Sequence, residues 1–192
     1  MAVTPERMTL AEFLKLPEVK PALELRQGAV GQKVAPSGPH VAIQLWFGYQ
    51  IDMFAEPLEL ARAFAEIRVI LGTETYVPDI AVYRWDRIPE DEHGELPTHF
   101  RTPPDLIVEV MSPGQTLRAQ LDKCREYLGH GVRVTMLVEP ARRMVYILRP
   151  DHEVGPLREG DSIDVTDVLP GFEVTVSGLF ARIRARPSRR RE

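Results

Sequence analysis

The pattern of apolar and polar residues predicts a chain in which helices and strands alternate. Apolar residues recur at helical spacing over 37–55 and 116–131. The first of these segments opens with serine, glycine and proline, which is typical of a helix N-terminus. A shorter helix is predicted over 9–17, where Thr9 and Glu12 stand in capping-box relation, and a closing helix over 178–186.

Apolar segments rich in β-branched residues predict the strands. A hairpin is expected over 22–36, with its turn near Gln27 and Gly28. Further strands are predicted over 60–71, 76–85, 105–112, 132–140, 143–150 and 161–176. We find no repeat and no break in composition, so the chain should form one domain over 1–186, followed by a flexible basic tail over 187–192. The fold class is α/β (α+β), with one mixed central β-sheet flanked by helices and extra antiparallel strands.

A long connection separates two of the predicted strands. Residues 86–104 are polar and rich in proline. Connections of this length are uncommon inside compact domains, and they are more often functional or mobile than purely structural.

Composition narrows the class of protein without naming a function. Of 192 residues, 44% are apolar and 27% charged, which is typical of a soluble globular domain. A net charge of −4 does not indicate a surface coated for nucleic acid, although a local basic face stays possible. The single cysteine, Cys124, excludes an intrachain disulfide and fits a cytoplasmic protein. No segment is apolar for long enough to cross a membrane.

Carboxylates inside apolar strands are the first chemical signal. Glu109 interrupts an apolar run, and alternation places it on the same strand face as Asp105 and Ile107. Asp79 repeats the pattern, directly after a proline and before an apolar strand. A buried carboxylate is costly unless it is paired, hydrogen-bonded or bound to a metal. These two acids, with Lys123 on the following helix, suggest a site for a hard cation.

Each of these residues also has a simpler interpretation. Asp79 and Glu109 could lie in solvent at strand ends or pair with an arginine. Lys123 lies to one side of the apolar stripe of its helix, so a solvated lysine is its default interpretation. If the two acids are close, their repulsion should raise the pKa of one of them.

Five separated segments resemble the Uma-two family of restriction-endonuclease-like proteins. The segments are "LELRQGAV", "PSGPHVAIQLW", "YVPDIAVY", "PPDLIVEVMSPGQTLRAQLDKCREYLGHGVRVTMLVEPARRMVYILRP" and "DVLPGFEVTVSGLF". The resemblance as a whole runs in order from about Thr9 to Phe180. The resemblance implies the fold of the PD-(D/E)XK nuclease superfamily, whose core is a mixed sheet flanked by helices.

The resemblance also assigns roles to particular residues. Asp79 matches the superfamily's metal-binding aspartate and Glu109 its second acid. The superfamily usually has a lysine two residues after that acid, where this chain has Met111. The Uma-two pattern takes a lysine from the next helix instead, and Lys123 matches it. Glu24 matches an early glutamate that joins the acidic cluster.

Two further positions have weaker assignments. The Val110 carbonyl could be an additional ligand for Mg²⁺ or Mn²⁺, the ions that such a site implies. His40 falls where the family often has histidine. A site role and the role of a polar residue in the first turn of a helix are equally open for it.

The resemblance implies a metal-dependent endonuclease that hydrolyses phosphodiester bonds of DNA. A non-catalytic module that binds nucleic acid or a protein partner is the main alternative, and a hydrolase acting on another phosphate substrate is a third. Because a duplex has two strands to cut, we expect a homodimer. Candidate phosphate contacts are Arg84, Arg87, Arg101, Arg118, Arg125, Arg142 and Arg143.

Overall fold

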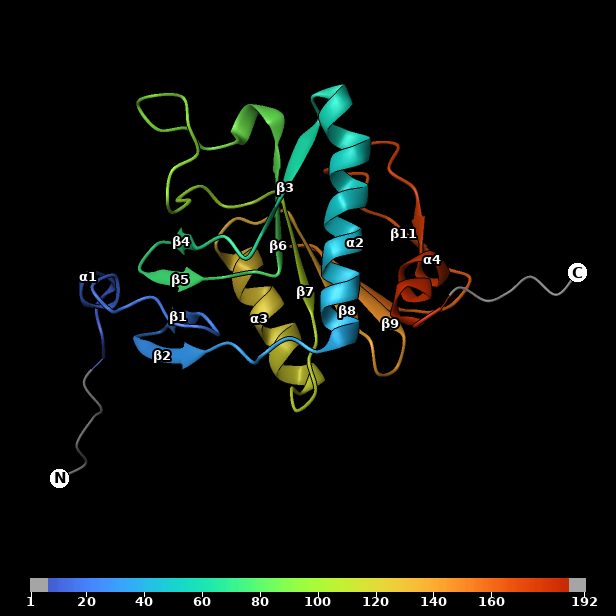
Figure 1. The fold of residues 1–192 in the computed structure, drawn as a ribbon, viewed down its shortest axis with the longest axis horizontal. Coiled ribbons are helices and arrows are strands. Elements are labelled where there is room, and N and C mark those ends of the chain that lie inside the picture. Colours follow the sequence, from blue (N-terminus) through green and yellow to red (C-terminus); the bar gives the residue numbers. More distant parts are fainter. Residues whose placement is uncertain (1–6, 187–192) are drawn as a thin grey trace, which may run out of the picture.

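A six-stranded mixed sheet forms the centre of the computed structural model, which describes residues 7–186 (Figure 1). Its strand order is β10-β9-β8-β7-β6-β3, and only β7 and β8 run parallel to each other. The strands are β3 (Ala61–Ala65), β6 (Ile80–Arg84), β7 (Leu106–Val110), β8 (Val134–Glu139), β9 (Met144–Leu148) and β10 (Glu153–Leu157). This architecture confirms the predicted fold class. The predicted tail, 187–192, lies outside the described residues.

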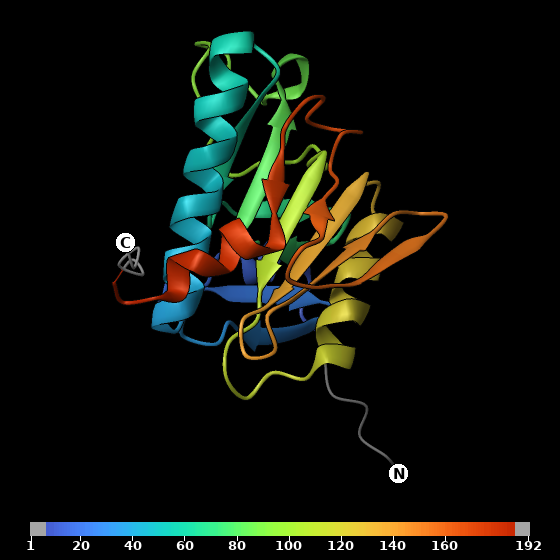
Figure 2. The same ribbon diagram turned by 90° about the vertical axis from the view of Figure 1, so that its right-hand side faces the viewer.

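Helices cover both faces of this sheet, as Figure 2 shows. α2 (Gly38–Ala55) and α4 (Val176–Phe180) lie on one face, and α3 (Leu117–Gly129) lies on the other. α2 begins as predicted, because the Ser37 side chain accepts a hydrogen bond from the His40 N–H. The remaining short helices are α1 (Leu10–Phe13), η1 (Glu56–Leu58), η2 (Trp85–Arg87) and η3 (Ala181–Ile183).

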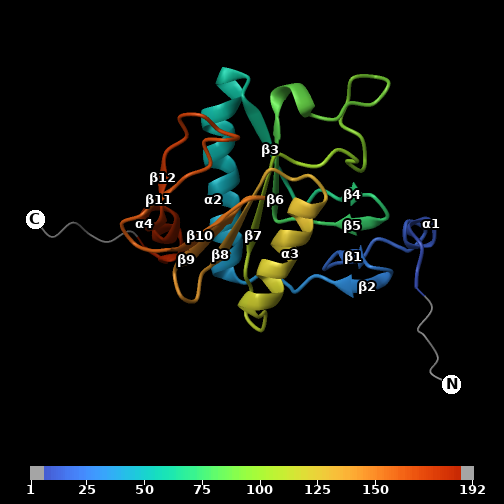
Figure 3. The ribbon, with the colours of Figure 1, turned by 180° about the vertical axis from the view of Figure 1, so that it is seen from behind.

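A second, four-stranded antiparallel sheet lies beside α3 (Figure 3). It contains β1 (Leu23–Arg26), β2 (Ala29–Gln32), β4 (Val69–Leu71) and β5 (Glu74–Tyr76), and a small pair, β11 (Ser162–Ile163) and β12 (Val174–Thr175), stands apart. The predicted hairpin is β1–β2. Its two turn residues, Gln27 and Gly28, have φ angles of 52° and 76°, as the tightest hairpin turns require.

The predicted strand 60–71 proved wrong, because it is divided between the two sheets as β3 and β4, whereas most of the predicted strand 76–85 forms β6. The chain leaves the large sheet after β3 at Glu66, whose φ of 51° turns the backbone, and enters the small sheet as β4. It returns through Pro78, which has no N–H to continue a ladder, and begins β6. Asp79 therefore lies at a junction between the sheets. Two other expectations also changed, since β10 was not predicted and the segment 161–176 forms only two-residue strands.

The predicted alternation along β7 is confirmed. Val108 and Val110 belong to the core beneath α2, whereas Ile107 packs with Tyr127 on the α3 side. Glu109 points to the α3 side as well, where it contacts Tyr127. The described part of the chain contains no helix with the length and hydropathy that a membrane crossing requires.

Candidate active site

Three buried carboxylates from different strands line one pocket of about 380 Å³. They are Glu24 on β1, Asp79 just before β6 and Glu109 on β7, with exposed fractions of 8%, 1% and 5%. Lys123 from α3 lines the same pocket and is 5% exposed. The structure thus brings together the four residues that the sequence singled out, although it does not test their chemical roles.

Sheet register explains how these acids meet. Ile80 pairs with Val108, so the residue before β6 lies beside the end of β7 that carries Glu109. β5, in the small sheet, is followed closely by Asp79 and β6, and it also pairs with β1, the strand that carries Glu24. The junction between the two sheets therefore builds the site.

Lys123 joins two of the carboxylates. Its Nζ lies 3.0 Å from Oε1 of Glu24 and 3.1 Å from Oε1 of Glu109. Tyr127, one helical turn further along α3, donates a 2.7 Å hydrogen bond to the same Glu109 oxygen. The default interpretation of a solvated lysine was therefore wrong. Burial lowers the pKa of Lys123, but the carboxylates of Glu109 and Glu24 outweigh burial and hold that pKa above its usual range.

A second lysine, Lys33, was missed in the sequence. Its Nζ lies 2.7 Å from Oδ1 of Asp79 and 2.8 Å from the Val77 carbonyl oxygen. Burial lowers the pKa of Lys33, yet the Asp79 carboxylate outweighs it and raises that pKa. The hairpin register offered a signal. Glu24 pairs with Gly31, so Lys33, two residues beyond Gly31, faces the same side as Glu24.

The other oxygen of Asp79 is also held. The Val110 N–H donates a 2.7 Å hydrogen bond to Oδ2, and His40 Nε2 lies 3.3 Å from it without hydrogen-bond geometry. His40 Nδ1 in turn lies 3.1 Å from Oγ of Ser112. Burial works to raise the pKa of Asp79, but His40 and Lys33 outweigh it and lower the pKa to about 2. His40 is thus both a first-turn residue and a neighbour of the acidic cluster.

Glu109 behaves differently from Asp79. Its burial outweighs the attraction of Lys123, and Asp79 adds repulsion, so the pKa of Glu109 lies above its ordinary value. The expectation that one acid of a close pair would have a raised pKa therefore fits Glu109. The two carboxylates are distinct, because Asp79 is held in its charged form and Glu109 takes up a proton more readily.

The donor set suits a hard cation, although it is not arranged as a ready ligand cage. Within residues 7–186, no three His, Cys, Asp or Glu side chains form a group that could hold a metal ion. Mg²⁺ needs only one or two carboxylates, because it keeps several waters. The oxygens of Asp79, Glu109 and Glu24 supply this chemistry in one pocket. When all three are ionised, they face only two ammonium groups, so negative charge is left over. The residues fit such an ion once Lys33 moves away from Asp79.

Several candidate residues lie away from this pocket. Asp105 is fully buried but pairs with Arg87 and Arg133. Arg84 ends β6, the strand that Asp79 begins, so Arg84 and Arg87 lie at the opposite end of the sheet. Arg101 does not line the pocket either. The long connection 86–104, which carries Arg87 and Arg101, therefore contributes no residue to the lining of the acidic pocket.

The other candidate phosphate contacts are mostly engaged with acids. Arg118 and Arg125 contact Asp122, and Arg125 also pairs with Glu153. Arg142 pairs with Glu139. These pairs are exposed on the arginine side, which limits their contribution to stability.

Comparison with known proteins identifies the class of protein to which this mixed sheet and its buried acids belong. The family model Uma2, described as "Putative restriction endonuclease", matches residues 10–177, so the chain belongs to this family. A solved structure, described as "a putative nuclease belonging to DUF820 from Anabaena variabilis", is 35% identical, with a TM-score of 0.86. The match covers 91% of this chain and 98% of that one. A comparison with curated proteins found no match.

Proposed function

We propose that the protein is a metal-dependent endonuclease that hydrolyses phosphodiester bonds of DNA in the cytoplasm. One observation carries the proposal: three buried carboxylates and a buried lysine line a single open pocket. Such burial is costly for a purely structural cluster. Membership of the Uma2 family supports the nuclease class. The metal, the DNA substrate and the compartment are parts of the proposal.

The residues divide the chemistry between them. Asp79 and Glu109, with Glu24 and the Val110 carbonyl as further candidates, would hold Mg²⁺ or Mn²⁺. When bound, such an ion supplies charge stabilisation at a phosphate oxygen and lowers the pKa of a bound water. Lys123 would orient the attacking water and balance the negative charge gathered beside it. Tyr127 keeps Glu109 in place through its hydrogen bond.

Removal of the carboxylate at Asp79 tests the proposal directly. Asp79→Ala should weaken Mn²⁺ binding beyond detection by calorimetry and lower the rate of plasmid nicking by about 10³-fold or more, since both roles depend on the same oxygen atoms. Asp122→Ala, on the exposed side of α3, is the matched control and should behave as wild type. Nicking that persists unchanged in Asp79→Ala, or that survives EDTA, would show that this pocket is not the active site.

One observation favours the alternative of a non-catalytic binding module. Lys33 and Lys123 already neutralise much of the acidic cluster, so the pocket is electrostatically stable without an ion. If the purified protein binds Mn²⁺ at Asp79 yet cuts neither DNA nor RNA, this alternative replaces the proposed endonuclease. The homodimer that we expected remains part of either version.

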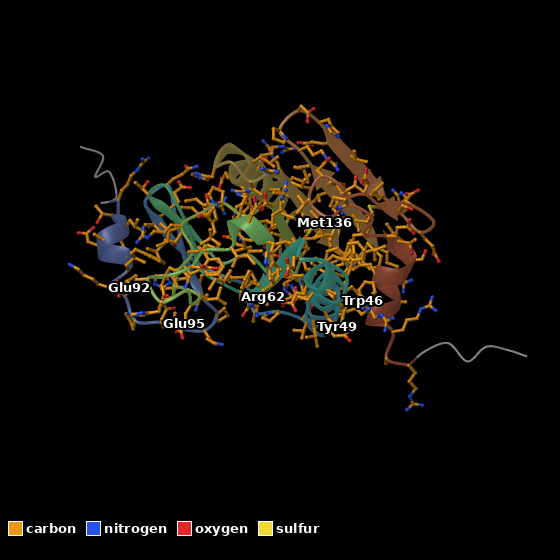
Figure 4. All side chains as sticks on the ribbon, turned by 90° about the horizontal axis from the view of Figure 1, so that it is seen from above. Trp46, Tyr49, Arg62, Glu92, Glu95 and Met136 are labelled. Atoms are coloured by element: carbon orange, nitrogen blue, oxygen red, sulfur yellow. The ribbon has the colours of Figure 1, made fainter. Side chains whose placement is uncertain are left out.

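The outer face of α2 offers a surface for that homodimer. Val41, Leu45, Tyr49 and Met53 recur every four residues and are 46%, 73%, 57% and 57% exposed. Figure 4 shows Tyr49 at the margin of the molecule, pointing away from its body. These four positions carry no charge, so the stripe could pack against its own copy across a twofold axis.

Light scattering tests this arrangement. Wild type should have the mass of a dimer at tens of micromolar, and Leu45→Glu should shift it to a monomer, because a buried unpaired charge opposes the packing. Leu96→Glu, an exposed leucine in the long connection, is the control and should leave the mass unchanged. A monomeric wild type would contradict the prediction.

A further inference from the structure

A second pocket in the molecule is lined by arginines instead of acids. It has a volume of about 240 Å³ and lies between three segments: the β8–β9 turn, the loop after β10, and α4 with the residues that follow it. The β8–β9 turn contributes Arg142 and Arg143, the loop after β10 contributes Arg158, and the residues after α4 contribute Arg184. Glu159 is the one acid among its lining residues, and Ser177 adds a hydroxyl. Four arginines and one glutamate among the lining residues give the pocket a surplus of positive charge in a chain of net charge −4.

Most of these arginines have no acidic partner in the described chain. Arg142 pairs with Glu139 at 2.8 Å. Within residues 7–186, no carboxylate oxygen lies within 4.0 Å of the guanidinium nitrogens of Arg143, Arg158 or Arg184. Like-charged groups that converge without counter-ions are costly to the fold, and a bound anion removes that cost. Arginine, with its planar fork of donors, is the side chain best suited to phosphate.

The amino-acid sequence extends the basic character beyond the pocket. Six arginines stand between positions 182 and 191, and this run begins at the segment that supplies Arg184. A concentration of arginine in one short stretch is typical of segments that contact polyanions.

The arginine pocket and the acidic pocket lie at the same end of the large sheet. Glu109 is near the end of β7, and parallel pairing places the end of β8, followed by Arg142 and Arg143, at that same edge. β10 ends there too, because Leu157 pairs with Val145 near the start of β9. The arginine pocket is lined by α4, on the same face of the sheet as α2, whereas Glu109 and Lys123 lie on the α3 face, so a duplex that reaches both pockets has to cross the end of the sheet.

We propose that this arginine pocket binds a backbone phosphate of the nucleic acid whose scissile bond lies at the acidic pocket. The inference rests on the proposed function for its choice of substrate. It adds a phosphate-binding subsite that positions the duplex across the end of the sheet. The contact is to phosphate, so it gives affinity and orientation and carries no base specificity.

Binding measured without cleavage tests the subsite. A short fluorescein-labelled DNA duplex is titrated with protein in EDTA and followed by anisotropy at several salt concentrations. Arg158→Glu/Arg184→Glu should weaken binding by at least about tenfold and should reduce the slope of log K against log salt by about one to two, the contribution of the lost phosphate contacts. Both residues are exposed, so the double variant should remain folded, which thermal melting checks.

Lys15→Glu/Arg62→Glu is the matched control, because it makes the same change of net charge at two exposed positions that line neither pocket. It should weaken binding by less than about threefold. Equal losses in the two double variants would overturn the inference, and so would a wild type that does not bind the duplex.

A titration with inorganic phosphate or pyrophosphate is the second test. Tight binding of either ion that depends on Arg158 and Arg184, with duplex binding unaffected by their loss, would identify a small-anion site and overturn the nucleic-acid assignment. A wild type that binds duplex through this pocket but cuts nothing with Mg²⁺ or Mn²⁺ would instead overturn the proposed function and leave this subsite standing.

Discussion

Lys123→Met should lower the rate of metal-dependent DNA cleavage by about 10²-fold or more, the scale of a lost acid–base or electrostatic group. The same change should destabilise the metal-free protein by about 3–5 kcal/mol, because it leaves the buried carboxylates of Glu24 and Glu109 without their shared cation. Metal binding should persist or tighten, since a lysine is not a ligand for a hard cation. Plasmid nicking, chemical denaturation and calorimetry with Mn²⁺ measure the three effects.

The comparison of these measurements separates catalysis from stability. Mn²⁺ should restore most of the lost stability of Lys123→Met, because the ion replaces the missing positive charge between the two acids. It should not restore the rate. Lys15→Met, at an exposed position, is the control for removal of a lysine. If saturating metal restores both stability and cleavage, the role of Lys123 is structural, and the assignment of a water-orienting lysine fails.

Lys123 shows what helix periodicity alone can predict about a side chain and what it cannot. The spacing of Leu117, Leu121, Cys124 and Leu128 correctly predicted an α3 stripe that packs on the sheet, and it correctly placed Lys123 to one side of that stripe. It could not predict what covers this side, because Glu24 arrives from a different sheet. The sequence had already connected Lys123 with Asp79 and Glu109 as a possible cation site, whereas only the family resemblance connected Glu24 with them.

The local sequence pattern also could not predict that the segment 60–71 is divided between two sheets. Apolar residues on both sides of Glu66 look like one strand, although β3 is only partly buried and belongs to the large sheet, whereas β4 is fully buried in the small one. The only local marker is the backbone at Glu66, whose positive φ is not encoded by a glycine. Pro78 was a better marker, and it could have predicted that the segment 76–85 breaks just before Asp79.

Lys33 differs from both cases, because the sequence itself contained a signal for it. The turn at Gln27 and Gly28 fixes the hairpin register, and the register places Lys33 on the same face as Glu24. We overlooked it because β2 reads as an exposed strand, where a lysine needs no explanation. The acidic site is therefore better described as two carboxylate–lysine units: Asp79 with Lys33, and Glu24 and Glu109 with Lys123.

Lys33→Met should raise the affinity for Mn²⁺ by about tenfold or more, which corresponds to at least ~1.4 kcal/mol of binding free energy. The Lys33 ammonium lies 2.7 Å from Oδ1 of Asp79, and an ion bound to that oxygen at about 2.1 Å would need the same space. Metal binding must therefore displace Lys33, and its removal eliminates that cost. The metal-free variant should lose about 3–5 kcal/mol of stability, because Asp79 is 1% exposed and loses its ion-pair partner.

Calorimetry with Mn²⁺, and chemical denaturation with and without the ion, measure both effects on the same samples. Saturating Mn²⁺ should bring the stability of Lys33→Met close to that of metal-bound wild type, since the ion then occupies the position of the ammonium. Lys15→Met should change neither quantity. A Lys33→Met variant that is folded but binds Mn²⁺ no more tightly than wild type would show that Lys33 and the ion do not compete. The ion would then have to bind through Glu24 and Glu109, away from Asp79, and Asp79 with Lys33 would be a structural ion pair at the junction of the two sheets.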